Sequence, residues 1–314
     1  MIYLIVVSFV WAFSFGLIKT HLSGFDPNFI SCCRMLLSFL LFLPLLRLRH
    51  MSVRNVGFLA MIGMIQYGLM YMTYIASFHF LKAYQVALFT IFTPLYVTLI
   101  NDFFQRRFTG LFFAAALLAI IGTAVIVLRD IHQSDFRMGF ILVQISNLCF
   151  ALGQILYKKV MEQNPSQDSR VFALLYLGAL LVTFPSALYS TNGSIPALNL
   201  VQVLTLLYLG LLASGICFFL WNLGARRTNA GFLAVANNLK VPLAVACSMI
   251  FFHEKGNLIR LLVGGGIIVG SLALNELFLR QRRSRPTGSA DLSQGLPETQ
   301  ACGAANRPSS CFVK

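Results

Sequence analysis

Hydrophobic positions dominate this chain in ten stretches of about 20 residues each, and short polar segments separate them. A helix of about 20 apolar residues is long enough to cross the hydrocarbon core of a bilayer. Because lipid offers no hydrogen bonds, a spanning backbone has to satisfy its own polar groups, which favours helices. We therefore predict an all-α polytopic membrane protein. The predicted helices lie approximately at residues 2–19, 28–46, 56–78, 83–101, 109–128, 138–157, 170–189, 201–221, 230–252 and 260–279.

The composition supports this prediction and also marks a different segment at the end of the chain. Hydrophobic residues make up 58% of the sequence and charged residues only 11%, whereas soluble domains carry about 25% charged residues. The mean hydropathy is +0.77. From residue 280 onward the chain is rich in Ser, Gly, Pro, Gln and Arg and has no apolar period. Because such a segment buries too little apolar surface to order itself, we expect residues 280–314 to form a disordered cytoplasmic tail.

The net charge of +14 could indicate nucleic acid binding, but the placement of the charges indicates membrane topology. With a cytoplasmic N-terminus, 14 basic residues flank the spans on the inside and 6 on the outside, as the positive-inside rule requires. We predict a multi-pass protein of a bacterial cytoplasmic membrane, with both termini in the cytoplasm and no nucleic acid partner. The inside residues are Arg47, Arg49, Arg54, Arg106, Arg107, Lys158, Lys159, Arg170, Arg226, Arg227, Arg280, Arg282, Arg283 and Arg285, and the outside residues are Lys19, Lys82, Arg129, Arg137, Lys255 and Arg260.

The two halves of the chain share a pattern when one is shifted by 148 residues. The shift places Pro94 on Pro242, Phe103-Phe104 on Phe251-Phe252 and Gly122 on Gly270. Five spans in each half would insert the second half upside down relative to the first. We therefore predict two inverted five-helix repeats, over residues 1–130 and 137–279. Inverted repeats are typical of alternating-access transporters, whose substrate site lies near the midplane between the repeats. A duplicated scaffold without transport is the alternative.

One predicted span carries a lysine far from both of its ends. Lys240 lies within the apolar stretch 232–252, and a cation at such depth costs roughly 2.5 kcal/mol or more, so it is a functional candidate by default. Asn237 and Asn238 precede it and add two amides. We predict that Lys240, with these asparagines, binds an anionic group of the substrate. A structural tether of the lysine to carbonyls and amides is the alternative.

Two prolines lie at corresponding places in the halves, Pro94 in the fourth span and Pro242 in the ninth. A proline inside a helix removes a backbone donor and kinks the helix. Thr90 and Thr93 lie close enough to Pro94 to satisfy the groups that it frees. Because paired interruptions in both halves indicate the binding site of a transporter, we assign both prolines a role in helix kinking and gating.

Arg34 and Trp11 are further substrate-binding candidates within the spans. Arg34 lies about a third of the way into the second span, where its planar guanidinium could attract a carboxylate. Its position nearer the helix end slightly favours the alternatives, which are snorkelling to the outer interface or a structural hydrogen bond. Trp11 lies in the middle of its span and is the better cavity candidate. Trp221, at the end of the eighth span, is expected in the interfacial aromatic belt.

Three tyrosines complete the set of predicted site residues. Tyr67, Tyr71 and Tyr74 are spaced as i, i+4 and i+7 through the middle of the third span. This spacing places them on one helical stripe. Such a stripe would offer a moderately polar solute apolar walls together with hydroxyl groups. Packing against other helices or lipid is the alternative.

The chain resembles the EamA family of the drug/metabolite transporter superfamily over roughly residues 2–279. The residues that carry the resemblance are Trp11, Lys19, Pro27, Arg34, Pro94, Pro242, Phe-Phe-His-Glu at 251–254, Gly122 and Gly270. One departure is Gln105-Arg106, where a glutamate usually follows the fourth helix of the family. The resemblance implies ten helices in two inverted repeats, a central cavity lined by both halves, and the movement of small metabolites, often amino acids or their relatives.

These features together predict a transporter and not an enzyme, since no catalytic constellation is present in the sequence. His79, His253 and Glu254 lack metal-ligand spacing, and we expect neither a metal nor a cofactor. The expected partners are a small-molecule solute and the lipid bilayer. Gly266 and Gly270 permit close helix packing within a protomer or across a dimer, so a monomer or homodimer is expected.

The predicted substrate is an amino acid or a related carboxylate-bearing solute, moved by alternating access through a central cavity. The cations, the asparagines and the aromatic side chains described above favour this class. The alternatives are an anionic, phosphorylated or nucleoside-containing metabolite, or a lipid-linked intermediate that the protein would flip.

Overall fold

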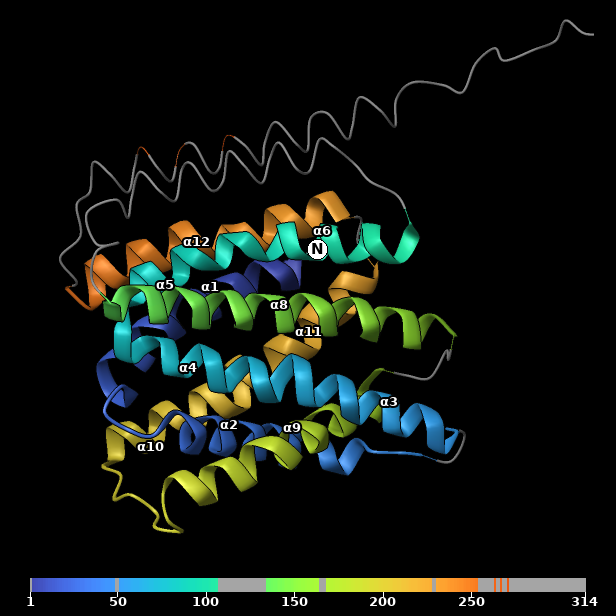
Figure 1. Cartoon of the computed structure of the whole chain (residues 1–314), viewed down its shortest axis with the longest axis horizontal. Coiled ribbons are helices and arrows are strands. Elements are labelled where there is room, and N and C mark those ends of the chain that lie inside the picture. The colour runs from blue at the N-terminus through green and yellow to red at the C-terminus, as the bar shows by residue number, and fades with distance from the viewer. Residues whose placement is uncertain are drawn as a thin grey trace, which may run out of the picture.

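A computed structural model of the chain describes residues 2–48, 51–106, 134–163, 168–227 and 230–253, together with residues 263, 266 and 270. Every regular element within these residues is helical (Figure 1). The elements are α1 (Ile2–Leu17), η1 (Ile18–Leu22), α2 (Pro27–Phe42), η2 (Leu43–Leu45), α3 (Val53–Gly63), η3 (Met64–Leu69), α4 (Met70–Phe80), α5 (Ala83–Phe89), η4 (Thr90–Phe92), α6 (Thr93–Gln105), α8 (Ser134–Gln163), α9 (Asp168–Ser190), α10 (Leu200–Leu207), η5 (Tyr208–Ile216), α11 (Cys217–Arg227) and α12 (Ala230–Phe251).

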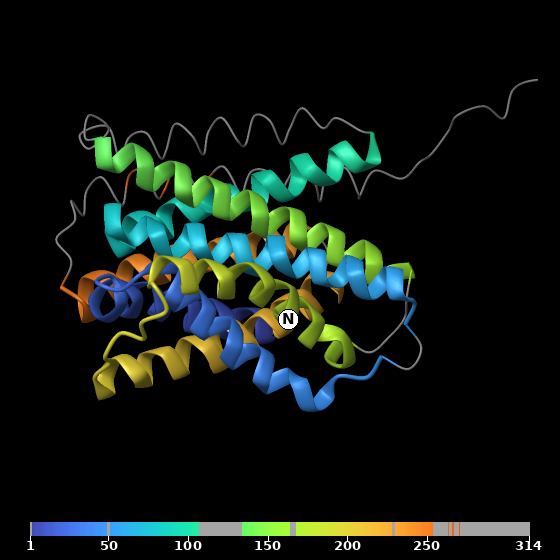
Figure 2. The same cartoon turned by 60° about the horizontal axis from the view of Figure 1, so that its bottom comes forward.

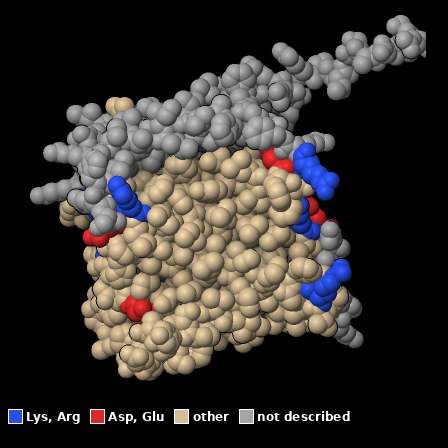
Figure 3. Space-filling model, viewed as in Figure 1, with Lys and Arg blue, Asp and Glu red and all other residues tan. Residues whose placement is uncertain are grey.

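Seven helices within the described residues are long and apolar enough to cross a membrane. They confirm seven of the ten predicted spans, and α12 covers the predicted span 230–252. The predicted spans 109–128 and nearly all of 260–279 lie outside the described residues. On the face seen in Figure 3, charged side chains gather toward two opposite edges, and the surface between them is uncharged. The chain is therefore an all-helical membrane protein with at least seven candidate spans. The seven are Leu4–Leu22, Pro27–Leu45, Val53–Phe80, Ala83–Phe104, Asp135–Glu162, Asp168–Ser190 and Leu200–Arg226.

Side-chain caps fix where two of these helices begin. The carboxylate of Asp26 accepts a hydrogen bond from a backbone N–H in the first turn of α2, and Pro27 occupies the first position of that helix. Proline suits this position because its missing N–H would have no partner there. At the start of α10, Asn199 and Gln202 form a reciprocal capping box. The first residue of each of these helices is therefore set by local capping residues.

The long helices 53–80 and 200–227, the third spans of the two halves, are each interrupted by a π-helical segment. η3 separates α3 from α4, and η5 separates α10 from α11. A π segment widens the helical turn and often marks a functional position. It also changes which side chains share a face on its two sides.

The two prolines have different local structures. Before Pro94 the 3₁₀ turn η4 ends α5, and the proline occupies the first turn of the new helix α6. The helix of span 83–104 therefore changes to 3₁₀ geometry just before Pro94 and continues as α6. α12, in contrast, continues through Pro242. The two prolines thus follow a 3₁₀ turn in the first half and lie inside a continuous α-helix in the second.

Contacts between the two halves come in corresponding pairs, in which a helix of each half packs against the equivalent partner helix of the other half. α9 packs against η3, and α2 packs against η5. α1 lies along α12, and α8 lies along α6 and α4, as Figures 1 and 2 show from two directions. α2 and α9 cross between these pairs. The elements that build the cavity described below therefore come from both halves.

Candidate functional site

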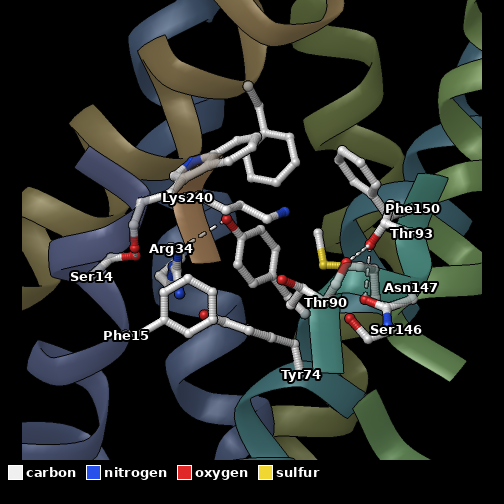
Figure 4. Close-up of a pocket in the computed structure, with 14 residues that line it drawn as sticks. Ser14, Phe15, Arg34, Tyr74, Thr90, Thr93, Ser146, Asn147, Phe150 and Lys240 are labelled. Atoms are coloured by element: carbon white, nitrogen blue, oxygen red, sulfur yellow. Dashed lines mark hydrogen bonds between the residues drawn. The ribbon is translucent and has the colours of Figure 1, made fainter. Parts of the chain in front are cut away.

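A cavity of about 530 Å³, part of which is open solvent, lies among helices of both halves. Figure 4 shows its lining side chains converging from several elements. The first half contributes residues of α1, α2, α4, η4 and α6, and the second half contributes residues of α8, α11 and α12. The lining residues are Trp11, Ser14, Phe15, Arg34, Met70, Tyr71, Tyr74, Thr90, Thr93, Ser146, Asn147, Phe150, Phe218 and Lys240.

Arg34 is held inside the bundle by side chains of two other helices. Only 2% of the residue is exposed. Its Nε donates to the Ser214 hydroxyl at 3.0 Å and its Nη2 donates to the Tyr71 hydroxyl at 2.9 Å. Nη1 is buried and has no hydrogen-bond partner within the described residues. Snorkelling is therefore wrong for Arg34, because these contacts direct the guanidinium into the protein and not toward the interface. The other alternative, a structural hydrogen bond, is confirmed by the bonds to Ser214 and Tyr71.

The π segment η5 supplies several of the groups that fix this side of the cavity. Ser214, the partner of Arg34, lies in η5. The carbonyl of Ala213 accepts from Trp11 Nε1 at 2.9 Å, and the carbonyl of Ser214 accepts from the Tyr176 hydroxyl at 2.6 Å. Because a backbone carbonyl has two lone pairs, it can accept from a side chain in addition to its helical bond. These bonds therefore anchor Trp11 of α1 and Tyr176 of α9 to η5.

Lys240 extends from α12 into the same cavity and is buried. Its Nζ lies 5.3 Å from the ring centroid of Trp11 and 5.9 Å from that of Phe150. Both distances are within the range of cation–π attraction. The predicted partners Asn237 and Asn238 are on the same helix, but their side chains lie outside the described residues.

The charge of the cavity wall is one-sided. Arg34 and Lys240 are its two charged residues, and no acidic side chain occurs among the described lining residues. Because both charged groups are cationic, a wall of this kind favours an anionic group in the cavity.

A second polar group of side chains lines the wall opposite Arg34 in Figure 4. Thr93 Oγ1 donates at 2.7 Å to the carbonyl of Thr90, whose α-helical donor would be the N–H that Pro94 lacks. The backbone N–H of Thr93 donates to the same carbonyl. The predicted rescue of freed backbone groups by threonine is thus confirmed. Thr93 Oγ1 also lies 3.2 Å from Asn147 Oδ1, which links α6 to α8. Ser146 is buried beside Asn147.

The structure separates the three predicted tyrosines. Tyr71 and Tyr74 line the cavity, whereas Tyr67 does not. Tyr67 is fully buried among other aromatic rings and accepts a hydrogen bond from Asn222 Nδ2 at 2.5 Å. The reason is η3, which contains Tyr67 and widens the turn just before α4, so the regular spacing assumed from the sequence does not apply across it. A direct role of Tyr67 in binding stays a prediction.

The two tryptophans pack against each other, and Trp11 lines the cavity. Trp11 lines the wall as expected from its position in the middle of a span, with its ring 4.8 Å from that of Phe218. Trp221 is only 1% exposed, lies 5.1 Å from the Trp11 ring and donates to Gln154 Oε1 at 3.2 Å. The prediction of Trp221 as an interfacial belt residue is wrong, because Gln154 satisfies its indole N–H inside the bundle.

Sequence reasoning did not identify several lining residues. Ser146 and Asn147 form a polar pair in the middle of the span 138–157, a signal that could have been used. Met70, Phe150 and Phe218 carry no such signal, because apolar side chains occur throughout every span.

Comparisons with known proteins agree with an all-helical membrane transporter. The profile of the EamA-like transporter family matches residues 1–128 and again residues 137–275. A probable biotin transporter of Pseudomonas aeruginosa is 40% identical over 90% of this chain and 99% of its own. The biotin transporter of Escherichia coli K12 is 36% identical over 90% of this chain and 95% of its own.

More distant similarities are also found. A probable amino-acid metabolite efflux pump of Salmonella typhimurium is 25% identical over 58% of this chain and 62% of its own. A crystal structure aligns with a TM-score of 0.67 at 15% identity, covering 89% of this chain and 98% of its own, and shows a likeness of fold alone. The family matches cover most of the chain, so the resemblance carried by Trp11, Arg34 and the two prolines is confirmed: this chain belongs to the EamA-like transporter family and is a multi-pass membrane transporter, not an enzyme.

Proposed function

We propose that this chain transports biotin and that Arg34 and Lys240 bind the carboxylate of the substrate. The observation that carries the proposal is the pair of cationic side chains in the wall of one cavity, with no acid among the described lining residues. Nη1 of Arg34 has no partner within the described part of the chain, so a donor is available for a carboxylate oxygen. The relatives at 36–40% identity support biotin among the carboxylates.

The other lining residues suit the remainder of the biotin molecule. Biotin joins a carboxylate arm to a sulfur-containing ring that is fused to a cyclic urea. Phe15, Phe150, Phe218 and Met70 offer aromatic and thioether surface for the arm and the sulfur ring. Apolar walls with a small number of polar groups are the usual composition of a small-molecule site.

An amino acid, the substrate class preferred from the sequence, fits this cavity less well. Its α-ammonium group would enter a wall that holds two cations and, among the described residues, no acid. Like charges in a poorly hydrated site repel each other strongly. The relatives named as probable amino-acid metabolite efflux pumps are also more distant, at 25% identity over 58–59% of the chain. These observations favour a carboxylate that carries no ammonium group.

We further propose that transport proceeds by alternating access between two inverted five-helix repeats, over residues 1–130 and 137–279. Two observations support this architecture. The family profile matches the chain twice, and the packing of α9 on η3 has a counterpart in the packing of α2 on η5. Arg34 comes from one half and Lys240 from the other, so a rocking of the halves would change how the two cations face the solute.

The proposed cellular setting is a bacterial cytoplasmic membrane, with both termini in the cytoplasm and the protein present as a monomer or homodimer. The bacterial relatives support the setting. The excess of basic residues on one side of the predicted spans supports the orientation.

Counterflow in proteoliposomes tests the proposed function irrespective of the direction of transport. Vesicles that contain the full chain are loaded with unlabelled biotin and diluted into labelled biotin. We expect transient accumulation of label that external biotin abolishes. Biotinamide, which replaces the carboxylate by a neutral amide, should compete at least tenfold less well, because it cannot pair with the cations.

Three outcomes would contradict the proposal. Counterflow of an amino acid, a phosphorylated metabolite or a nucleoside-containing solute, without counterflow of biotin, would assign a different substrate. Movement of a lipid-linked saccharide between leaflets would assign a flippase. Vesicles that show no solute flux with any of these compounds would support a scaffold.

A further inference from the structure

The wall of the cavity opposite Arg34 is polar but uncharged. It consists of Thr90, Thr93, Ser146 and Asn147, contributed by η4, α6 and α8, and is called here the amide–hydroxyl wall. All four residues are buried. In Figure 4 this group and Arg34 lie on different sides of the cavity, with the aromatic rings of Tyr74 and Phe15 near the Arg34 side. A solute that reaches from one side to the other would meet two different chemistries.

The hydrogen-bond donors of three of these residues, Thr90, Thr93 and Asn147, are already committed to protein acceptors; the Ser146 hydroxyl beside them can donate or accept. A hydroxyl has one proton to donate. Thr90 Oγ1 donates to the carbonyl of Ala87 at 2.7 Å. The proton of Thr93 lies between the carbonyl of Thr90, at 2.7 Å, and Asn147 Oδ1, at 3.2 Å. The threonines therefore keep oxygen lone pairs but no free proton.

The donor protons of Asn147 are also committed within the protein. An amide NH₂ group has two protons, and Asn147 Nδ2 donates to the carbonyl of Phe89 at 2.8 Å and to Gln144 Oε1 at 3.3 Å. The bond to the Phe89 carbonyl, which can only accept, also fixes which side of the Asn147 amide is oxygen. Asn147 Oδ1 retains a lone pair beyond its contact with Thr93. Thr90, Thr93 and Asn147 thus form a surface of acceptors that is held in place by their own donors.

We propose that the amide–hydroxyl wall is a specificity surface that accepts hydrogen bonds from the N–H groups of a cyclic urea. The proposal rests on the function proposed above and extends it, because it orients the substrate with its carboxylate at Arg34 and Lys240 and its ureido ring against Thr90, Thr93 and Asn147. A buried acceptor surface discriminates against a ligand that brings no donor, since the acceptors would then lose their water without replacement. Carboxylates that lack N–H groups should therefore bind more weakly than a cyclic urea at this wall.

Two ligands test the donor requirement in the parent protein. Lipoate shares the carboxylate arm and lacks the ureido ring. The cyclic carbamate analogue of biotin replaces one ureido N–H by an oxygen atom and keeps the shape of the ring. We expect both to bind about tenfold or more weakly than biotin in equilibrium binding to the purified full chain. Equal affinity of biotin and the carbamate would overturn the acceptor wall and leave biotin transport standing. A parent protein that binds neither biotin nor the carbamate would overturn both proposals.

Substitutions in the wall test whether these residues provide the discrimination. In the double variant Thr90→Val, Thr93→Val the ratio of carbamate to biotin dissociation constants should fall from about ten toward one. Thr93→Ser retains the hydroxyl and should keep the parent ratio. Thr183→Val is the matched control, because Thr183 is equally buried, donates to its own helix at Ala179 O and does not line the cavity.

The affinity ratio separates recognition from folding. A purely structural role of the threonines would weaken the binding of both ligands equally and leave the ratio unchanged, which would overturn the proposal. A changed ratio in Thr183→Val would also overturn it, because discrimination would then not be local to the wall.

Discussion

At the residue scale, the cavity stabilises two buried cations with aromatic rings. The guanidinium carbon of Arg34 lies 4.1 Å from the centroid of the Tyr71 ring, and Lys240 Nζ lies 5.3 Å from that of Trp11. Each such contact contributes about 0.5–2 kcal/mol. This is less than the cost of taking a cation out of water, so the aromatic faces keep the charges in place and leave a carboxylate as the stronger partner.

Arg34→Lys tests the geometry of one cation with its charge retained. Lysine cannot reproduce the fixed fork that bonds Ser214 and Tyr71 and leaves Nη1 available. We expect the affinity for biotin to fall about tenfold or more, measured by equilibrium binding to purified protein. Arg54→Lys, at an exposed position of α3, is the matched control and should bind like the parent. Parent-like affinity in Arg34→Lys would show that carboxylate binding does not depend on the guanidinium geometry of Arg34.

Lys240→Met tests the other cation. Methionine keeps much of the stem volume and removes the charge, so we expect the variant to insert and fold normally yet lose most biotin counterflow. Lys240→Arg should recover flux only partly, because the guanidinium is larger and planar. Monodispersity and melting temperature in detergent provide the folding control. A well-folded Lys240→Met with parent-like flux would show that Lys240 is not a binding residue, and a variant that fails to fold would favour the structural tether.

Individual site residues differed in how well the sequence could reveal them. Lys240 and Arg34 stand out because a charge in an apolar span is rare and costly. Asn147 and Ser146 were missed because small polar residues occur in many spans, and only their contacts with α6 distinguish them. Tyr67 was grouped with the cavity because a regular helical spacing was assumed, and the sequence carries no evident signal for the π segment that contains it.

At the scale of elements, close helix packing depends on glycines at the crossing of α3 and α9. A Cβ atom at Gly63 would overlap the carbonyl of Leu175, and one at Gly178 would overlap the carbonyl of Ala60. Small residues at a helix crossing let two backbones approach closely in a membrane. This crossing places α9 against η3, next to the helix α4 that carries Tyr71 and Tyr74.

Gly63→Ala should therefore destabilise the protein, whereas Gly57→Ala on the same helix should not. The added methyl group at Gly63 has to separate the helices, at a cost of roughly 1–3 kcal/mol. At Gly57 nothing lies within 4 Å of the added atom, and alanine favours the helix by up to about 1 kcal/mol. Melting temperatures in detergent measure both. Equal melting temperatures of the two variants would contradict the packing of this crossing.

The spans could be predicted from the sequence because bilayer thickness sets their length, and seven of them are found within the described residues. Their interruptions could not be predicted equally well. Pro94 gave a signal for the 3₁₀ turn at η4, but η3 and η5 have the same apolar composition as the helices around them. A π segment changes the hydrogen-bond pattern without changing hydropathy, so a periodicity argument does not detect it.

At the scale of the whole molecule, polar contacts tie helix ends together at two ends of the bundle. At one end Arg226 forms an ion pair with Asp168 at 2.6 Å, joining α11 to α9. At the other end the Ser190 hydroxyl donates to Asp26 Oδ1 at 2.7 Å, joining α9 to the start of α2. α9 therefore extends from one end to the other, and the predicted orientation places its Asp168 end in the cytoplasm.

Cysteine labelling tests this orientation. Ser194→Cys lies in the exposed segment after α9, and Val53→Cys lies at an 89% exposed position at the start of α3. In intact cells a membrane-impermeant maleimide should label the first variant and not the second. Permeabilised cells should show labelling of both, which controls for reactivity. The reverse pattern in intact cells would contradict the predicted topology and the positive-inside argument.

The central claim is that Arg34 and Lys240 hold the carboxylate of biotin, and a ligand–variant cycle tests it most directly. The measurement is the equilibrium affinity of biotin and of biotinamide for the parent and for the double variant Arg34→Gln, Lys240→Met. We expect the parent to prefer biotin by at least tenfold and the variant to bind the two ligands equally and weakly, because the preference originates in the two charges. A variant that is folded and retains the parent's preference for biotin would contradict the account.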